Sequence, residues 1–223
     1  MNNKDTIIHE AQKLFSLKGY LNTGVKEIIQ AAGTSKGGFY NHFASKEELF
    51  HEVLAESQRI WRDVVIKPSS DVESPTTIII QMLLNYREKY LKDSENFPGG
   101  CIFITFSVEL DDTHPHLAKK VHQGFEGFKA LLKRLLKEAI ELGELPNDLN
   151  PTTVTEMLFT GMLGSSVLFG VNKSRATLDC SIDSLIEYLL MLSNKNVINH
   201  VLKEVHLNIQ EDCFDDLDEQ TSL

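Results

Sequence analysis

The sequence of 223 residues predicts an all-helical fold. Apolar residues recur at spacings of three and four, which is the period of an amphipathic helix. Glycine and proline turn signals divide the chain into segments of helical length. Strict alternation of apolar and polar residues, the pattern of a half-buried strand, is scarce. We therefore expect helices to supply all of the regular structure.

Two amphipathic helices are expected before the first tight turn. The first ends at Gly19 and has apolar residues at helical spacing, namely Ile7, Ile8, Ala11, Leu14 and Phe15. The second passes through Val25 and Ile28 and ends at Gly33, because glycine readily adopts the left-handed conformation that closes a helix. We expect the side chain of Thr23 to cap the first turn of this second helix.

A short third helix and a long fourth helix follow. Ser35 is the expected N-cap of the third helix, which reaches Phe43. Ser45 and Glu48 form a capping box, in which each side chain accepts a hydrogen bond from a backbone N–H of the first turn. This capping box opens a long helix that extends to about Trp61.

The remaining chain is predicted to form further helices joined by polar loops. These helices are expected at about 76–91, 101–110, 112–143, from 151 onward, and at 178–193, and the stretch 196–209 can add one more. Residues 101–110 are of types that favour strands, and we assign them to a buried helix because partner strands are lacking. Asn150 is the expected N-cap of the helix that begins with Pro151. Residues 211–223 carry six acids and no bases, which predicts a frayed end.

The charge is unevenly distributed along the chain. The formal net charge is -10, yet residues 1–46 contain six lysines and three acids, a local charge of +3, which leaves -13 for the remainder. A basic patch on an acidic protein is compatible with DNA binding. Chance clustering explains the same charge pattern equally well.

Composition argues against several protein classes. Cys101, Cys180 and Cys213 are odd in number and far apart, so they predict neither a disulfide framework nor a metal site, and they favour a reducing, cytoplasmic compartment. We find no secretory signal, and the longest apolar runs fall short of the ~20 residues of a membrane span. Nucleotide-binding and hydrolase motifs are lacking, so we expect neither an enzyme nor a cofactor.

The stretch 23–50 predicts a helix-turn-helix. Two short helices meet at a tight turn at Gly33, and the second helix of such a motif enters the major groove of DNA. Gly37 and Gly38 are costly inside a helix, each by ~1 kcal/mol relative to alanine, and are explained if the helix lies close to DNA. The alternative is a helical hairpin that only packs against the rest of the protein.

Polar side chains around these glycines can bind the DNA backbone. Lys36 supplies positive charge at the start of the third helix, and Tyr40, Asn41 and His42 offer hydrogen bonds to phosphate. Lys46 lies at the start of the fourth helix, where free backbone N–H groups also attract phosphate.

Three motifs in this stretch together resemble the DNA-binding signature of TetR-family regulators. They are Ala31-Ala32-Gly33-Thr34-Ser35-Lys36-Gly37, Tyr40-x-His42-Phe43 and Ser45-Lys46-Glu47-x-Leu49. The resemblance implies a DNA-binding domain at 1–47 and a helical ligand-binding and dimerisation domain at 48–223. It assigns to the groove and its edges Lys26, Thr34, Ser35, Lys36 and Gly38, and to the phosphates Tyr40, His42 and Lys46. Gly24, Ile29 and Thr34 depart from the usual signature.

The second half of the chain resembles one subgroup of this family, in which a Gly-Cys pair begins the sixth helix. Here the pair is Gly100-Cys101, and some members of that subgroup sense electrophiles or unsaturated acids. A thiol at a helix N-terminus has a lowered pKa and is more nucleophilic. The alternative is that Cys101 is a small buried apolar residue. Residues His114, His116 and His122 could suggest a metal, but a solvated helix start explains them better.

Two further sets of residues are predicted from the helical pattern. Candidate walls of a ligand pocket are Trp61, Met82, Tyr86, Cys101, Phe103, Phe106, Phe125, Phe128, Met157 and Met162. The resemblance implies dimerisation through the last two core helices, and the candidate interface residues are Leu158, Gly161, Ser165, Leu185, Tyr188, Leu189 and Leu192. The alternatives are an ordinary core for the first set and a contact within one chain for the second.

Together these features predict a transcription regulator. We expect a homodimer that binds double-stranded operator DNA, acts as a repressor, and is released by a small apolar or electrophilic effector. Activation in place of repression stays open, because the sequence does not show promoter geometry.

Overall fold

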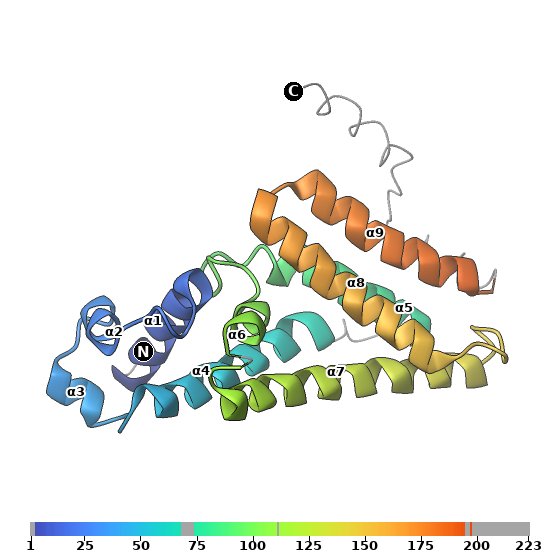
Figure 1. Ribbon diagram of the computed structural model, residues 1–223. Helices are drawn as coiled ribbons and strands as arrows, with labels where there is room; N and C mark the ends of the chain where they lie inside the picture. Colours follow the sequence, from blue (N-terminus) through green and yellow to red (C-terminus); the bar gives the residue numbers. More distant parts are fainter. Residues whose placement is uncertain (1–2, 68–73, 111, 195–196, 198–223) are drawn as a thin grey trace. The chain divides into compact units, whose positions relative to one another are not determined.

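The computed structural model describes residues 3–67, 74–110, 112–194 and 197. Every regular element in these ranges is a helix, which confirms the all-helical prediction (Figure 1). Apart from Val197, the residues of the predictions for 196–209 and 211–223, and the third cysteine at position 213, lie outside the described residues.

The chain forms two compact units. Unit 1 comprises residues 1–67 and 85–130, and unit 2 comprises residues 68–84 and 131–223. The first helix of unit 2 therefore leads directly into unit 1, and the longest helix begins in unit 1 and ends in unit 2. The division into a DNA-binding domain at 1–47 and a second domain at 48–223 stays a prediction.

The first four helices of unit 1 surround a core of aromatic and aliphatic side chains. They are α1 (Asn3–Lys18), α2 (Val25–Ala31), α3 (Lys36–Tyr40) and α4 (Lys46–Trp61). Their buried apolar residues are Ile7, Ala11, Phe15, Ile28, Phe39, Phe43, Leu49, Phe50 and Val53. Edge-to-face aromatic contacts join the elements, with the rings of Tyr20 and Phe50 centred 5.2 Å apart. Of the apolar residues predicted for α1, Ile7, Ala11 and Phe15 lie in the core, whereas Ile8 and Leu14 are only partly covered.

Local hydrogen bonds fix where these helices begin. Ser35 Oγ accepts a bond from the N–H of Gly38 at 2.9 Å. Ser45 Oγ accepts from the N–H of Glu48 at 3.1 Å, and the Glu48 carboxylate accepts from the N–H of residue 44 at 2.6 Å. These bonds confirm the Ser35 cap and the Ser45 half of the capping box, while the Glu48 carboxylate binds the N–H one residue before the N-cap.

The predicted cap of α2 is wrong. The N-cap residue is Gly24, which has no side chain to accept a hydrogen bond. Thr23 is fully buried, and its hydroxyl donates to the carbonyl oxygen of Gly19 at 2.7 Å. Thr23 therefore stabilises the end of α1 and the turn that follows it.

Two π-helical turns extend the helices on either side of residues 68–73. The first, η1 (Arg62–Ile66), continues α4, and the second, η2 (Tyr86–Tyr90), continues α5 (Pro75–Asn85). The two π turns contact each other within unit 1. The predicted helix at 76–91 therefore exists, but its last turn is a π-helix, which the sequence pattern did not indicate.

The stretch 101–110 is helical and not a strand. It forms α6 (Ile102–Leu110), whose buried residues include Ile102, Phe103 and Phe106. Helix α7 (Pro115–Glu141) follows.

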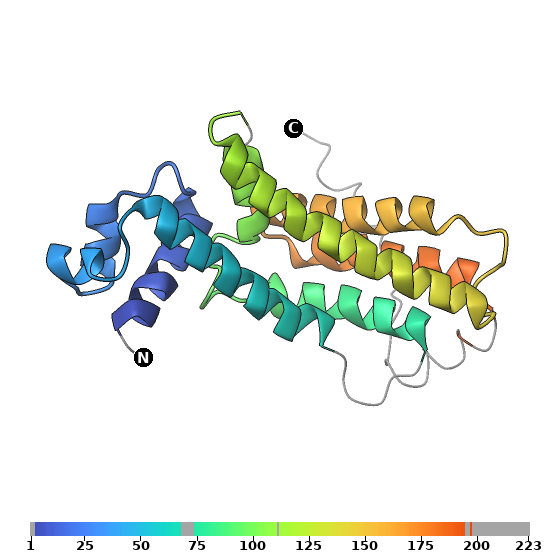
Figure 2. The ribbon, with the colours of Figure 1, turned by 90° about the horizontal axis from the view of Figure 1, so that it is seen from below.

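Two long helices dominate unit 2 and lie side by side in both ribbon views (Figures 1 and 2). They are α8 (Pro151–Asn172) and α9 (Arg175–Leu192). Asn150 caps α8, with its side-chain oxygen accepting from the N–H groups of Thr152 at 3.0 Å and Thr153 at 3.4 Å, as predicted. Helix α8 is long and apolar enough to cross a membrane, but a single helix of this kind is weak evidence, since helices packed inside proteins pass the same test.

Candidate nucleic-acid interface

The predicted DNA-binding residues lie on three consecutive parts of unit 1. Lys26 is on α2, Thr34 and Ser35 form the turn, and α3 with the residues after it carries Lys36, Gly38, Tyr40, Asn41 and His42. Lys46 is the first residue of α4. Apart from Thr34, Gly38 and Lys46, which are partly covered, these residues are exposed.

Helix α3 has one buried side and one exposed side, although it is only five residues long. Phe39 is fully buried, and its ring centroid lies 5.7 Å from that of Phe43, which is also buried. Lys36 and Tyr40 lie on the exposed side, and Tyr40 remains 47% exposed although its ring contacts Phe39. The buried phenylalanines therefore anchor α3 so that its polar residues face outward.

The lysines of this region differ in their partners. Three of them form ion pairs within the chain, namely Lys4 with Glu52, Lys13 with Glu10 and Lys18 with Glu27. Lys26 and Lys36 are exposed and form no ion pair with the part of the chain that the structure describes. Among the lysines of residues 1–46, those on α2 and α3 are therefore the exposed ones whose charge is not paired within the described chain.

Lys46 has a more enclosed environment. Its ammonium lies 4.2 Å from the centre of the Tyr20 ring, a cation–π contact. Burial lowers the pKa of Lys46, and the negative charge of Glu109 opposes this by raising it. Lys46 is therefore only partly exposed and lies over the turn between α1 and α2.

The two glycines of α3 have different surroundings. A Cβ atom added to Gly38 would lie 2.5 Å from the Thr34 hydroxyl oxygen. A Cβ atom added to Gly37 would meet only the Ser35 hydroxyl oxygen, at 3.8 Å. Packing within the chain therefore explains a glycine at position 38 and does not explain one at position 37.

The residues predicted to line a ligand pocket fall into separate groups. Met82, Met157 and Met162 belong to unit 2, and Met157 is exposed. The other seven belong to unit 1, namely Trp61, Tyr86, Cys101, Phe103, Phe106, Phe125 and Phe128.

Contacts within unit 1 divide these seven residues further. The ring of Trp61 packs edge-on against Phe128 at 4.6 Å. The ring of Phe106 lies 4.8 Å from that of Phe50 and so belongs to the core beneath α4.

A second aromatic group surrounds Cys101. Tyr86 and Tyr90 are stacked with ring centroids 5.7 Å apart, and the Tyr90 hydroxyl lies 3.8 Å from Cys101 Sγ. Phe103 stacks on Tyr90 at 6.4 Å. This group of buried rings and one thiol is the part of the predicted pocket that the structure brings together.

The expected low pKa of Cys101 is wrong. Burial raises the pKa of the thiol, and hydrogen bonds from the backbone of Ile104 and Phe103 and from the tyrosine hydroxyls offset this only in part. The thiol at the start of α6 is therefore held in its neutral form, because desolvation outweighs the effect of the helix N-terminus.

The histidines near the start of α7 have polar neighbours. His116 Nε2 lies 3.1 Å from a carboxylate oxygen of Glu47, and His114 Nδ1 lies 3.1 Å from the Thr113 hydroxyl. Among the described residues, no three side chains of histidine, cysteine or acid type are placed to hold a metal ion.

Most of the residues predicted for the dimer interface pack inside unit 2 of the same chain. Leu158, Ser165, Leu185 and Leu189 are buried. A Cβ atom at Gly161 would lie 2.5 Å from Leu185 Cδ2, so the small residues of α8 allow α9 to approach closely. Tyr188 and Leu192 are partly exposed.

A different set of apolar residues is exposed on α8 and α9. It consists of Met157, Val167, Leu168, Val171 and Met191. Four of the five recur along α8 at helical spacing, on the side away from its buried residues. Sequence reasoning did not select this face, because both sides of α8 are apolar.

Glu109, near the end of α6, is a site residue that sequence reasoning missed. Its two carboxylate oxygens accept hydrogen bonds from the backbone N–H groups of Tyr20 at 2.6 Å and Leu21 at 2.9 Å. An acid in the last turn of a helix is disfavoured by the helix dipole. That unusual position was the available signal for a role outside the helix.

Comparisons with known proteins match both halves of the chain. The family model for bacterial regulatory proteins of the tetR family matches residues 7–53. The model for the tetracyclin repressor-like C-terminal domain matches residues 79–185.

Individual relatives and solved structures agree with this assignment. The transcriptional repressor DhaR of Mycobacterium sp. (strain GP1) is 28% identical over 193 residues, covering 86% of this chain and 94% of the relative. An uncharacterized HTH-type transcriptional regulator of Lactococcus lactis subsp. lactis is 32% identical over 143 residues, covering 59% and 72%. The crystal structure of a TetR transcriptional regulator from Chloroflexus aurantiacus J-10-FL has a TM-score of 0.76 at 24% identity, covering 86% and 96%. The chain therefore belongs to the TetR family and is a DNA-binding transcription regulator rather than an enzyme.

Proposed function

We propose that this protein is a homodimeric, cytoplasmic repressor that binds double-stranded operator DNA and is released by a small-molecule effector. The observation that carries the proposal is the exposed polar side of α3, where Lys36 and Tyr40 project from a helix anchored by buried Phe39. In a TetR-family chain, this is the helix that would enter the major groove.

The contacts to DNA divide into two kinds. Lys26, Thr34, Ser35, Lys36 and Gly38 would lie in the groove or at its edges. Residues Tyr40, Asn41, His42 and Lys46 would bind phosphate, and contacts of this second kind set the position and orientation of a protein on DNA without reading its sequence.

The exposed apolar face of unit 2 supports dimerisation. Met157, Val167 and Leu168 are exposed on α8, although large apolar side chains on one helix face are expected to be covered. A second copy of the chain that packs α8 and α9 against the same helices would bury this face in a four-helix arrangement. Two recognition helices would then reach successive major grooves, ~34–36 Å apart.

The names of two relatives support repression. DhaR, which is 28% identical, is named a transcriptional repressor, and so is NemR of Escherichia coli, which is 21% identical over 173 residues. The buried rings around Cys101 favour an apolar effector over a reactive one, because burial raises the pKa of the thiol and keeps it in its less nucleophilic neutral form. Activation of transcription is the alternative within the same class.

The experiment uses duplexes selected from a random pool with the purified full-length protein. Fluorescence anisotropy then gives the dissociation constant at two salt concentrations for the wild type, Lys36→Ala, Tyr40→Ala and the control Lys119→Ala. Lys119 is an exposed lysine of α7, so its removal changes the net charge without touching α3.

We expect Tyr40→Ala to weaken binding by at least about tenfold, because a hydrogen bond to a charged group contributes ~1.5–3 kcal/mol. Lys36→Ala should weaken binding. It should also reduce, by about one, the slope of the logarithm of the binding constant against the logarithm of the salt concentration. Lys119→Ala should bind like the wild type. Equal losses for Lys36→Ala and Lys119→Ala would refute the proposed interface. Adding N-ethylmaleimide to the complex then separates the effector classes, since a reactive effector predicts release from DNA in the wild type and not in Cys101→Ala.

A further inference from the structure

Helix α6 is attached near its start to α1 and near its end to the turn that follows α1. Before its start, the N–H of Gly99 donates to Ser16 Oγ at 2.9 Å, and the Ser16 hydroxyl donates to the carbonyl oxygen of Gly100 at 3.2 Å. A Cβ atom at Gly99 would lie only 1.9 Å from the Ser16 carbonyl oxygen, so the two backbones are in direct contact. This attachment leaves no room for any other residue at position 99.

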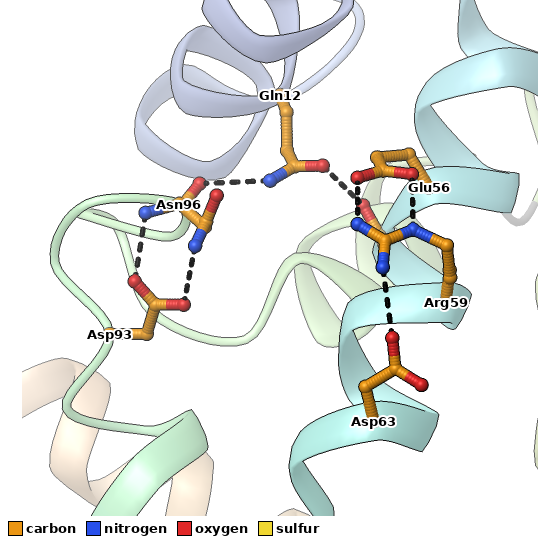
Figure 3. A network of polar contacts seen from close by, with 7 residues as sticks. Gln12, Glu56, Arg59, Asp63, Asp93 and Asn96 are labelled. Atoms are coloured by element: carbon orange, nitrogen blue, oxygen red, sulfur yellow. Dashed lines mark hydrogen bonds and ion pairs between the residues drawn. The ribbon is translucent and has the colours of Figure 1, made fainter.

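The loop before α6 is also tied to α1 and α4 through Gln12 (Figure 3). The buried Gln12 side chain donates to the carbonyl oxygen of Asn96 at 3.5 Å and accepts from the Ser57 hydroxyl at 3.3 Å. Asp93 holds Asn96 through two further bonds, of 2.9 and 2.7 Å. The segment that leads into α6 is thus fixed to the helices beneath the DNA-binding surface.

The other end of α6 is attached through Glu109. Its carboxylate accepts from two successive backbone N–H groups, those of Tyr20 and Leu21, in the turn between α1 and α2. Gly19 in this turn has φ +84°, and a Cβ atom there would lie 2.4 Å from the Glu109 carboxylate. Glycine is therefore required both by the backbone conformation and by the space that the carboxylate occupies.

The attached turn borders the DNA-binding surface. It leads directly into α2, and the ring of Tyr20 lies under the ammonium group of Lys46 at 4.2 Å. Two charge-assisted hydrogen bonds to adjacent amides restrict the turn more than a contact between apolar side chains would. A displacement of α6 therefore has to move this turn or break both bonds.

From this geometry we infer that Glu109 is a positioning residue, which holds the α1–α2 turn in the arrangement that binds DNA and couples that arrangement to α6. The inference deepens the proposed function and rests on it, because it assigns a regulatory contact to the same DNA-binding surface. The coupling acts through α1 and its following turn, in addition to any direct movement of α4.

The test compares Glu109→Gln with the control Glu95→Gln. Both variants remove one negative charge from unit 1, and Glu95 is exposed in the loop before α6. The glutamine at position 109 keeps one carbonyl oxygen, so it can accept from only one of the two amides. Loss of a negative charge alone should tighten binding to DNA, whereas loss of the attachment should weaken it, so the two effects differ in sign.

Two measurements are made on the full-length protein with a selected duplex. Anisotropy should show that Glu109→Gln binds DNA at least about fivefold more weakly than Glu95→Gln, at equal thermal stability. Hydrogen exchange should show that DNA changes the protection of residues 102–110 in the wild type and in Glu95→Gln, and no longer does so in Glu109→Gln. A residue that only stabilises the fold would not abolish this response to DNA.

Each result has a defined meaning. If Glu109→Gln binds DNA as tightly as Glu95→Gln, or if α6 keeps its response to DNA in that variant, the positioning role of Glu109 is wrong while the proposed function stands. If the wild type selects no duplex at all, the proposed DNA-binding function itself fails and the coupling fails with it.

Discussion

At the scale of single residues, the two glycines of α3 allow a direct test of how closely this helix approaches DNA. Gly37→Ala should raise the free energy of unfolding by up to about 1 kcal/mol, since alanine is the better helix former and its Cβ meets only the Ser35 hydroxyl oxygen, at 3.8 Å. The same variant should bind selected DNA at least tenfold more weakly, because the added methyl group points to the side that DNA would occupy.

Gly38→Ala is the matched control for this prediction. Its Cβ would lie 2.5 Å from the Thr34 hydroxyl oxygen, so Thr34 must move and the gain in stability should be lost. Urea unfolding and anisotropy measure the two quantities for both variants. Wild-type DNA affinity in Gly37→Ala would show that α3 does not make a close backbone approach.

Cys101 provides a prediction about pH. Burial raises the pKa of its thiol in the folded protein above the ordinary value of ~8.5. Between the ordinary and the raised pKa, the thiol is deprotonated in the unfolded chain and protonated in the folded protein. The neutral thiol therefore contributes its full stabilisation of the fold below the ordinary pKa. This stabilisation is lost as the pH rises through the raised pKa.

Urea unfolding of the wild type and Cys101→Ala at pH 7.5 and 9.5 measures the contribution of the thiol together with its effect on Tyr90. The free energy of unfolding should fall more between the two pH values in the wild type than in the variant. An equal fall in both proteins would mean that the thiol is not held in its neutral form.

At the scale of elements, sequence reasoning succeeded where the physical cause is local. The side chains of Ser35, Ser45 and Asn150 cap helices whose N–H groups lie two or three residues away, so a short motif contains all the information. The exposed residues of the proposed DNA-binding surface lie within 26–46 for the same reason.

Sequence reasoning failed where a contact between distant parts of the chain determines the role of a residue. Glu109 binds amides 88 and 89 residues away, and a single sequence does not reveal such a pair. Thr23 was assigned to α2 because its residue type suits an N-cap, yet the carbonyl group of Gly19 was available to it. The helical pattern of α8 likewise does not show which of two apolar faces meets α9.

At the scale of the whole molecule, the exposed apolar face of α8 predicts how the protein assembles. Met157→Glu should convert a dimer of about twice 25.2 kDa into a monomer, since a twofold axis places the substituted carboxylate in the interface twice. Light scattering after size exclusion measures the mass, and circular dichroism checks that the helices persist.

Thr152→Glu is the control for this change. It places the same charge in the first turn of α8, where residue 152 is exposed and outside the apolar face. A dimer that survives Met157→Glu would exclude this face as the interface.

The two π turns have a consequence for chain length. In η1 the N–H of Lys67 bonds to the carbonyl of Arg62, and in η2 the N–H of Leu91 bonds to that of Tyr86, so each turn holds one residue more than an α-helix would. Removal of one residue from either segment can therefore be absorbed by converting that turn to an α-helix, with the preceding helix unchanged. Insertions and deletions among related chains should be tolerated at these two places and resisted along the rest of α4 and α5.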